Sequence, residues 1–355
     1  MVLFYLIFFF LILRFAVTLF NFISNPKLTS SAKRYHAPVS ILIQRESPGQ
    51  DLTQLLESIL KQDYQDFEVI ILDNATGIKT YQEVFKNDGR FRIITPKQAP
   101  QGWLEDNFAL YQLASRAKGE YFLFLMEDTI IANGLINNAV HRMKMNKLTL
   151  LSLFPDQRML SFGERIVVPL MHFMLLSLLP MRLVRLSRNP VFAASSEHFM
   201  LFDAGNYRQH QWHGKVKNKT AQPIEIMKLI KRSGYLAEVL LANGYISSRM
   251  YKNFNEASHG FGKILLGGFK NNAAGLVIYL LFVILGPIYI WYYLNWGLLF
   301  FAIALIILGK IMISLSSRQN TFLNIILHPL QILSLLFISI LSIKLFIEQN
   351  KDSTV

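Results

Sequence analysis

Four long apolar segments constrain this chain more than any other feature of its sequence. They cover residues 2–23, 273–293, 296–314 and 325–346. Each has about the 20 residues that a helix needs to cross the hydrocarbon core of a bilayer. The first segment lacks a basic start and a small-residue cleavage site, so we expect a retained anchor rather than a cleaved signal peptide. The sequence therefore predicts a multi-pass integral membrane protein.

Basic residues near the ends of these segments indicate their orientation. They are Lys27, Lys33 and Arg34 after the first segment, and Lys263, Lys270 and Arg318 beside the C-terminal segments. By the positive-inside rule, this asymmetry places both termini outside and the middle of the chain in the cytoplasm. The formal net charge of +13 suits the anionic lipids of the cytoplasmic leaflet. We recognise no nucleic-acid-binding motif, so we expect a membrane and not a nucleic acid as partner.

The middle of the chain alternates short apolar runs with helical patterns. The expected strands are 39–43, 67–72, 90–94, 121–125 and a short one near 198–202, and the expected helices include 52–60, one through 108–113, and 224–233 closed by Gly234. Such alternation predicts an α/β domain with a largely parallel, Rossmann-like sheet. Between the last two strands lies the apolar segment 166–186, which Pro169 and Pro180 interrupt. We interpret it as a helical segment at the membrane interface, although a crossing or a buried core helix remains open.

Acidic residues follow one of these strands directly. The apolar run Tyr121 to Leu125 leads into Glu127 and Asp128. Because ligands bind beyond the carboxyl ends of the strands in open α/β sheets, these carboxylates are a candidate metal or phosphate site. An exposed loop with a helix cap is the plainer alternative. Since the chain has no cysteine, thiolate metal sites and cysteine nucleophiles are excluded.

The order of these elements resembles a membrane-bound family-2 glycosyltransferase with the GT-A fold. The relevant branch includes ceramide glucosyltransferases and bacterial hopanoid and carotenoid glycosyltransferases. The best-preserved motifs are VSILI at Val39, LLESILKQDY at Leu55, EVIILD at Glu68, GW at Gly102, GEYFLFL at Gly119 and RMYKNFNEASHGFGK at Arg249. The resemblance covers essentially the whole chain. It implies an anchor over 1–24, a nucleotide-sugar-binding GT-A domain over 37–262 and transmembrane helices over 273–346.

The same resemblance implies a function and a set of site residues. The chain would transfer a sugar, with inversion, from a nucleotide-sugar donor to a lipid or polyisoprenoid acceptor at the cytoplasmic membrane face. The implied residues are Asp73, Asn74, Asp128 and Arg249 for the donor, Trp103 and Tyr251 for the acceptor, and Glu127 and Asp128 for a divalent metal, Mn²⁺ or Mg²⁺. A metal would stabilise the charge of the leaving diphosphate. Arg249 offers a planar fork of donors that suits a phosphate.

Several family positions carry other residues in this chain. Met126 replaces the first carboxylate of the metal motif, and hard cations bind a thioether poorly. Gln222 and Pro223 occupy the places of the proton-accepting Glu-Asp pair, which leaves Glu225 as the candidate catalytic base. These changes support a second hypothesis, in which the protein is a catalytically inactive glycosyltransferase-like membrane protein that acts as a partner or assembly factor.

Two further polar residues are expected to be solvated. Arg45 follows the first strand in a polar turn, and His213 lies in a basic, polar stretch over 207–220 that we interpret as a loop. Loops run over the protein surface because their backbone groups need water, so we assign neither residue a role in the site.

Overall fold

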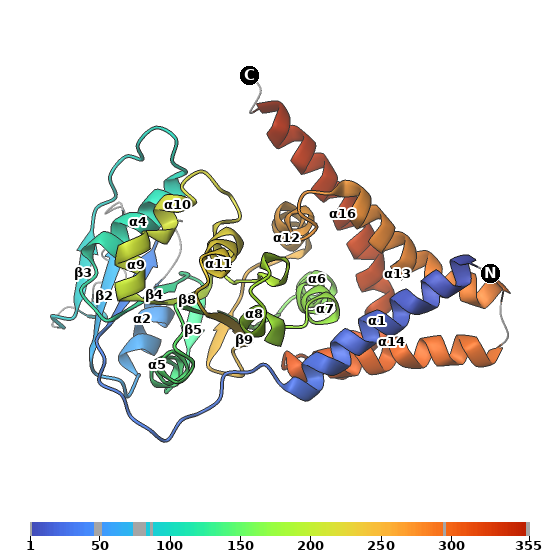
Figure 1. Cartoon of the computed structure of the whole chain (residues 1–355), viewed down its shortest axis with the longest axis horizontal. Coiled ribbons are helices and arrows are strands. Elements are labelled where there is room, and N and C mark those ends of the chain that lie inside the picture. The colour runs from blue at the N-terminus through green and yellow to red at the C-terminus, as the bar shows by residue number, and fades with distance from the viewer. Residues whose placement is uncertain (1, 46–51, 74–82, 86–87, 294–295, 353–355) are drawn as a thin grey trace. The chain divides into compact units, whose positions relative to one another are not determined.

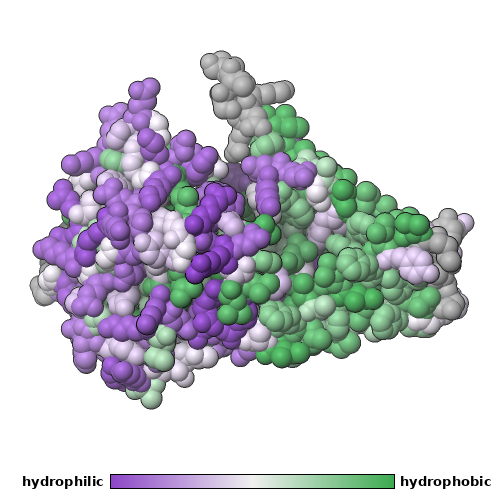
Figure 2. All heavy atoms as spheres, viewed as in Figure 1, coloured by the Kyte–Doolittle hydropathy of each residue, from purple (hydrophilic) through white to green (hydrophobic). Residues whose placement is uncertain are grey.

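The computed structural model describes residues 2–45, 52–73, 83–85, 88–293 and 296–352 (Figure 1). It divides into two compact units. The helical unit comprises Met1–Asn25, Gln157–Pro180 and Arg249–Val355, and the α/β unit comprises Pro26–Asp156 and Met181–Ser248. On the face seen in Figure 2, hydrophobic residues dominate the surface of the helical unit and hydrophilic residues that of the α/β unit.

A seven-stranded sheet of order β3-β2-β1-β4-β8-β6-β9 forms the centre of the α/β unit. Its strands are β1 (Val39–Gln44), β2 (Phe67–Leu72), β3 (Phe91–Ile94), β4 (Tyr121–Leu125), β6 (Leu150–Phe154), β8 (Phe199–Asp203) and β9 (Ala237–Leu241). The neighbours from β3 to β4 are parallel, β8 runs antiparallel to β4 and β6, and β6 is parallel to β9. The predicted α/β class is therefore confirmed, with β8 as the reversed strand.

Helices and one small sheet complete the α/β unit. The helices are α2 (Thr53–Leu60), α4 (Glu105–Arg116), α5 (Leu135–Asn146), α8 (Arg182–Leu186), η1 (Pro190–Phe192), α9 (Ala204–His210), α10 (Trp212–Lys215) and α11 (Gln222–Arg232). In the small sheet, β5 (Thr129–Ile131) pairs antiparallel with β10 (Ile246–Ser248). The further short strand β7 covers Asp156–Gln157. Gly234 ends the turn after α11 with a φ of 81°, a conformation that glycine adopts without strain.

The sequence analysis located β1, β2, β3, β4 and β8 closely but missed β6 and β9. Each of these strands carries one polar residue with a buried side chain, and specific partners satisfy it. Ser152 Oγ donates to Ser196 O at 3.1 Å, and Glu238 accepts from Arg142 Nε at 2.6 Å and Nη2 at 2.7 Å. Burial of a polar group is tolerated when it is hydrogen-bonded, and such partners cannot be read from a local apolar pattern.

Glu238 also forms ion pairs with two further arginines. Arg185 Nε lies 3.1 Å and Arg182 Nη1 3.7 Å from Glu238 Oε1, while the side chain of Glu238 is 2% exposed. One buried carboxylate therefore joins β9, α5 and α8 through charge. Breaking a buried ion pair by removing one partner is strongly destabilising, because the other charge stays buried without compensation.

We expect Glu238→Gln to lower the free energy of unfolding by about 3–5 kcal/mol, because three arginines lose their anion. Thermal unfolding of the detergent-solubilised protein measures the change. Glu225→Gln is the matched control, since Glu225 forms a partly exposed pair with Lys228, and it should change the unfolding free energy by less than about 1 kcal/mol. Equal effects of the two substitutions would contradict the structural role of the Glu238 cluster.

The helical unit contains the long apolar helices. Its helices are α1 (Val2–Ser24), α6 (Phe162–Val167), α7 (Pro169–Leu178), α12 (Phe254–Gly268), α13 (Ala273–Tyr293), α14 (Trp296–Ser316), α15 (Thr321–Ile326) and α16 (His328–Asp352). In the described part of the chain, four are long and apolar enough to cross a membrane: Val2–Ser24, Ala273–Tyr292, Trp296–Ser316 and His328–Glu348. The predicted arrangement of one N-terminal and three C-terminal apolar helices is confirmed, while their orientation stays a prediction.

The last span begins later than the sequence suggested. We expected one helix over 325–346, but α15 ends at Ile326 and α16 begins at His328. Pro329 explains the break, because proline lacks the N–H that would donate to the carbonyl of Ile325 in a continuous helix.

The two prolines divide the predicted interfacial segment 166–186 into separate helices. Pro169 starts α7, where its missing N–H has no consequence, and Pro180 follows the end of that helix. In the helical unit, Arg14 Nη2 donates to Ser177 Oγ at 3.3 Å, which fixes α7 against α1. Residues 157–180 and 249–262 group with this unit, although the prediction included them in the GT-A domain. The interfacial location stays a prediction.

Candidate functional site

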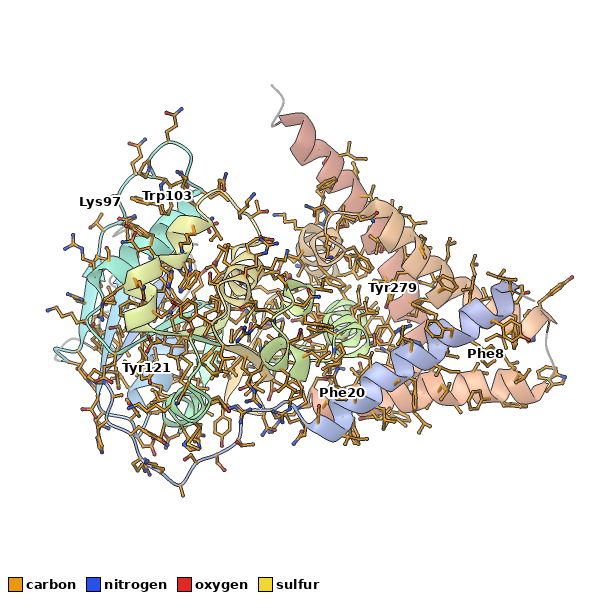
Figure 3. The ribbon with its side chains drawn as sticks, in the orientation of Figure 1. Phe8, Phe20, Lys97, Trp103, Tyr121 and Tyr279 are labelled. Carbon is orange, nitrogen blue, oxygen red and sulfur yellow. The ribbon has the colours of Figure 1, made fainter. Side chains whose placement is uncertain are left out.

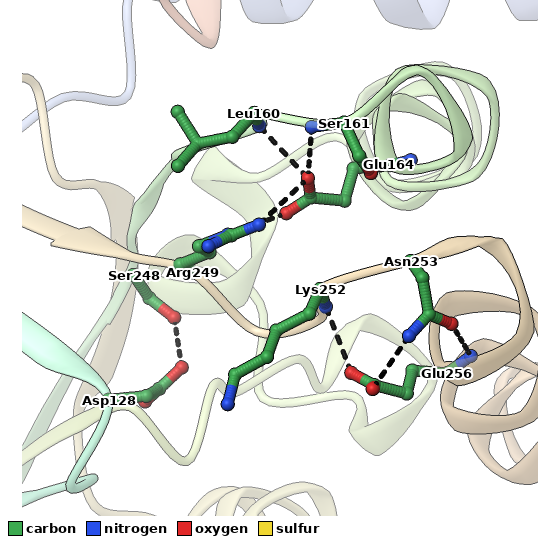
Figure 4. Close-up of polar contacts among 9 residues, drawn as sticks. All are labelled: Asp128, Leu160, Ser161, Glu164, Ser248, Arg249, Lys252, Asn253 and Glu256. Atoms are coloured by element: carbon green, nitrogen blue, oxygen red, sulfur yellow. Dashed lines mark hydrogen bonds and ion pairs between the residues drawn. The ribbon is translucent and has the colours of Figure 1, made fainter. Parts of the chain in front are cut away.

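The turn after β4 determines the position of Asp128. Met126 O accepts hydrogen bonds from Thr129 N at 3.3 Å and Thr129 Oγ1 at 2.7 Å, so the chain turns at Glu127 and Asp128 and continues as β5. The antiparallel pairing of β5 with β10 places Ser248 opposite Thr129. As a result, Ser248 Oγ donates a hydrogen bond to Asp128 Oδ2 (Figure 4).

His198 reaches the same carboxylate from the reversed strand. Because β8 runs antiparallel to β4, its first residue, Phe199, lies opposite Leu125, the last residue of β4. His198 precedes Phe199, and its Nε2 lies 3.5 Å from Asp128 Oδ2. Ser196 Oγ lies 3.3 Å from the other ring nitrogen of His198. The sequence analysis missed His198 and Ser248, since both reach the site through antiparallel strands.

These neighbours keep Asp128 ionised. Burial acts to raise the pKa of its carboxyl, but the hydrogen bond and charge of His198, together with the hydrogen bond from Ser248, hold the pKa below its usual range. Asp128 Oδ1 is buried and has no hydrogen-bond partner. A charged carboxylate with one open oxygen is suited to receive a cation or a hydrogen-bond donor.

The residues around Asp128 do not form a complete metal site by themselves. Among the described residues, no group of three His, Asp or Glu side chains is arranged to hold a metal ion. Glu127 is buried beside Asp128 in the turn. Mg²⁺ is commonly bound by one or two carboxylates together with substrate phosphates. The open Oδ1 of Asp128 fits that mode, in which the donor supplies the remaining oxygens.

Asp73 follows β2 at the same edge of the sheet as Asp128. It pairs with Arg45, whose Nη1 lies 3.0 Å and 3.3 Å from the two carboxylate oxygens. Both side chains are buried, so the expectation that Arg45 is solvated was wrong. The cause is the parallel pairing of β1 with β2, which brings the residues after the two strands together. Asn74 lies outside the described residues.

Trp103 belongs to an aromatic cluster. Its ring centroid lies 5.4 Å from that of Phe108 and 5.1 Å from that of Tyr111, both on α4. Figure 3 shows Trp103 in the loop that precedes this helix. The contacts explain how the loop is fixed, since aromatic pairs at such distances add about 0.5–1.5 kcal/mol beyond burial. The acceptor role of Trp103 stays a prediction.

Glu225 lies in the first turn of α11, which begins at Gln222 rather than at the predicted Ile224. Lys228 Nζ donates to Glu225 Oε1 at 2.7 Å, and both side chains are partly exposed. The helix start is thus two residues earlier than the sequence suggested. The role of Glu225 as a base stays a prediction.

His213 is buried, so the expectation of a solvated loop over 207–220 was wrong. Helices α9 and α10 occupy part of this stretch. Tyr207 Oη lies 2.6 Å from His213 Nδ1, and the imidazole packs on Phe124 with centroids 4.7 Å apart. Burial lowers the pKa of His213 to about 3, so the ring is neutral at physiological pH.

In the helical unit, Arg249 forms a forked ion pair with Glu164. Its Nε lies 2.9 Å from Glu164 Oε1, and its Nη2 lies 3.3 Å from Oε2 (Figure 4). Glu164 also accepts from the backbone N–H groups of Leu160 at 2.9 Å and Ser161 at 2.5 Å, which caps α6. The predicted phosphate-binding fork of Arg249 is therefore engaged by a carboxylate, and its donor role stays a prediction.

Tyr251 packs against α12. A Cβ added at Gly260 would lie 2.2 Å from Tyr251 Cε1, so only glycine permits this close approach. Helix α12 is itself capped, because Asn253 Oδ1 accepts from Glu256 N at 2.9 Å. The cap and the packed ring account for the structure of this motif, and acceptor binding by Tyr251 stays a prediction.

The Glu164 cluster should make stability depend on pH. Although burial acts to raise it, hydrogen bonds from Arg249, Ser161 and Leu160 lower the pKa of Glu164 to about 2 from an ordinary value of 4.5. A depressed carboxyl pKa gives stability that is complete above the unfolded pKa and is lost as pH falls. We expect about 3 kcal/mol to disappear as pH falls from about 4.5 to about 2.

Glu164→Gln should remove this part of the pH dependence, as measured by thermal unfolding midpoints in detergent across that range. The control Glu348→Gln alters an exposed carboxylate and should keep the wild-type profile. An unchanged profile in Glu164→Gln would contradict the assigned pKa.

Comparison with known proteins identifies the domain. Residues 41–208 match the sequence profile described as glycosyl transferase family 2. Over these residues the chain is similar to the family-2 glycosyltransferases. Among curated protein sequences, none matches the chain.

Solved structures provide a comparison for the fold of this glycosyltransferase domain. The Pyrobaculum calidifontis mannosyltransferase PcManGT, solved with GDP-Man and Mn²⁺, aligns over 92% of this chain and 95% of its own, with a TM-score of 0.52 and 12% identity. The predicted GT-A fold is thereby confirmed. S. aureus TarS 1-349 with UDP aligns over 64% of this chain and 65% of its own, with a TM-score of 0.42 and 17% identity. A further S. aureus TarS structure aligns with a TM-score of 0.40, and this chain spans 40% of the length of that TarS chain.

Proposed function

We propose that this protein transfers a sugar from a nucleotide-sugar donor to a lipid or polyisoprenoid acceptor at the cytoplasmic face of the membrane. The observation that carries the proposal is Asp128, an ionised carboxylate at the end of a central strand with one buried oxygen free of partners. The family-2 domain supports the same activity. The structure of PcManGT with GDP-Man and Mn²⁺ illustrates the kind of donor that such a fold can hold.

Donor binding is assigned to the carboxyl edge of the sheet. Asp73 and Asp128 follow parallel strands that are separated by β1, so the two positions are about 10 Å apart. A divalent cation, Mn²⁺ or Mg²⁺, would be held by Asp128 with Glu127 beside it, and when bound it neutralises charge on the leaving diphosphate. His198 and Ser248 orient Asp128 for this role.

The acceptor hydroxyl must lose a proton as it attacks the sugar. Glu225 is the residue assigned to this step, and it must exchange its ion pair with Lys228 for the acceptor hydroxyl. A lipid acceptor is proposed because four helices of the same chain are apolar enough to cross a membrane. The basic flanks of these helices support a cytoplasmic location for the domain.

Asp128→Asn tests donor binding. We expect it to weaken the binding of UDP or GDP in the presence of Mn²⁺ at least about 10-fold, because a full charge is lost at the cation. Isothermal titration calorimetry of the detergent-solubilised chain measures this affinity. The control Asp63→Asn removes a partly exposed carboxylate of the same unit and should leave the affinity unchanged. Absence of nucleotide binding in the wild type would overturn the donor assignment.

A catalytically inactive protein that serves as a partner or assembly factor is the second candidate function. Met126, Gln222 and Pro223 favour it, since each replaces a carboxylate of the family. The ion pair between Asp73 and Arg45 favours it too, because the carboxylate is already neutralised. Nucleotide binding without any sugar turnover would support this candidate.

Glu225→Gln separates the two candidates. If the chain is active, we expect kcat to fall about 100-fold with little change in KM for the donor, because a general base contributes about 10²–10⁴ to the rate. Transfer of a radiolabelled sugar into extracted lipid measures the rate. Lys228→Gln is the control, since it frees Glu225 without removing it and should keep most of the activity. Turnover that is equal in Glu225→Gln and the wild type would refute the assignment of the base.

A further inference from the structure

The helical unit holds two basic side chains within its apolar helices. Arg14 lies near the middle of α1, and Lys310 lies in α14, where the residue is 2% exposed. The ion pairs described in this unit join Glu164 to Arg249 and Lys344 to Glu348. Among the described residues, no carboxylate pairs with Arg14 or Lys310. Charged residues inside membrane segments are costly, and they commonly mark functional sites.

The two cations share one aromatic ring. The guanidinium carbon of Arg14 lies 4.7 Å from the ring centroid of Phe173 on α7, and Lys310 Nζ lies 4.5 Å from the same centroid. Each cation is therefore within about 10 Å of the other, and their charges repel. Cation–π contacts contribute about 0.5–2 kcal/mol each, which is less than the cost of a charge in hydrocarbon. The ring alone does not account for two basic residues here.

Neutral side chains complete the contacts of both cations. Arg14 Nη2 donates to Ser177 Oγ at 3.3 Å, and Lys310 Nζ donates to Gln331 Oε1 at 2.6 Å. Gln331 Nε2 in turn donates to Arg165 O at 3.1 Å. These hydrogen bonds hold both side chains in place and supply no countercharge.

A pocket of the helical unit opens beside Arg14. Its lining includes Arg14, Phe173, Ser177, Phe282, Gly309 and His328, from α1, α7, α13, α14 and α16. Arg14 Nε and His328 Nδ1 are buried and have no hydrogen-bond partner. Tyr279, labelled in Figure 3, places its ring 5.5 Å from the guanidinium of Arg14. The pocket thus combines a cation and unused polar atoms with apolar and aromatic walls.

We propose that this pocket, which Arg14 lines directly and which Lys310 adjoins through the ring of Phe173, binds the phosphate of an anionic membrane lipid. The guanidinium is suited to a phosphate, and basic pockets between membrane helices bind acidic headgroups. The apolar and aromatic walls suit the hydrocarbon next to a lipid phosphate, whereas a free inorganic anion would make no use of them. The inference goes beyond sugar transfer, because it rests on the helices alone. Two sources share this chemistry, the phosphodiester of a phospholipid and the phosphomonoester of an isoprenyl phosphate.

Native mass spectrometry of the purified full chain in detergent tests the proposal. Phosphatidylglycerol is compared with phosphatidylcholine, and an isoprenyl phosphate with the corresponding isoprenol. We expect the acidic lipid of at least one pair to bind about 10-fold more tightly than its neutral counterpart, because it supplies the missing charge. The pair with the larger ratio of affinity between its acidic and neutral lipid shows whether the pocket takes the phosphodiester of a phospholipid or the phosphomonoester of an isoprenyl phosphate. Equal binding within both pairs would overturn the proposal, whether or not the protein transfers a sugar.

The double substitution Arg14→Gln with Lys310→Met should abolish the preference for the acidic lipid. Lys344→Gln is the matched control, since it removes one charge at a position of α16 whose side chain is 70% exposed, and the preference should stay within about twofold of the wild type. The acidic lipid should also raise the Tm of the wild type and of the control by about 5 °C, and not that of the double variant.

The comparison of Tm with and without lipid within each variant makes the test independent of any change in basal stability. A double variant that keeps both the preference and the lipid-dependent Tm shift would refute the assignment of these two residues. Arg14→Lys, which retains the charge but not the planar fork, should keep part of the preference.

Discussion

The hydrogen bonding of β4 along both of its edges is the constraint on which the candidate site depends. On one side β1 pairs with it in parallel, and on the other β8 pairs with it in the opposite direction. The parallel side places the residues after β1, β2 and β4 at one edge of the sheet. The antiparallel side brings the start of β8 to that edge, and His198 with it. A central strand with two such neighbours has little freedom to shift in register, so the turn that carries Asp128 is fixed.

Charge compensation organises the buried polar groups of each unit. In the α/β unit, Asp73 is balanced by Arg45, Glu238 by Arg142 with two further arginines, and Asp128 by His198. In the helical unit, Glu164 is balanced by Arg249. Arg14 and Lys310 depart from this pattern, since their contacts are aromatic rings and neutral side chains. That contrast within one protein is the reason to regard their surroundings as a ligand site rather than as ordinary packing.

Much of the fold could be predicted because it follows from local patterns. The run from Tyr121 to Leu125 is apolar on both faces and stops at acidic residues, which identifies a buried strand and the position of Asp128. The long apolar helices follow from length and composition alone. β6 and β9 were missed since Ser152 and Glu238 break their apolar pattern, and their buried partners lie far away in the sequence.

The site was predictable only in part for a related reason. Asp128 could be placed, whereas His198 and Ser248 reach it through antiparallel pairing with elements distant in sequence. Arg45 was expected in solvent because its charge suggested a surface, and the neighbouring strand end supplied a carboxylate instead. His213 was misjudged in the same way, because Tyr207 satisfies one of its ring nitrogens inside the core. Local sequence gives the polarity of a side chain but not its partner.

Glu164 performs two tasks with one carboxylate, and this links events at two places in the helical unit. The same oxygens cap α6 and hold the fork of Arg249. A phosphate that drew Arg249 away would leave the carboxylate with backbone donors alone, and its affinity for a proton would rise. The first turn of α6, 85 residues earlier in the chain, therefore shares its capping carboxylate with Arg249. Whatever engages Arg249 would therefore change the charge balance at the start of that helix.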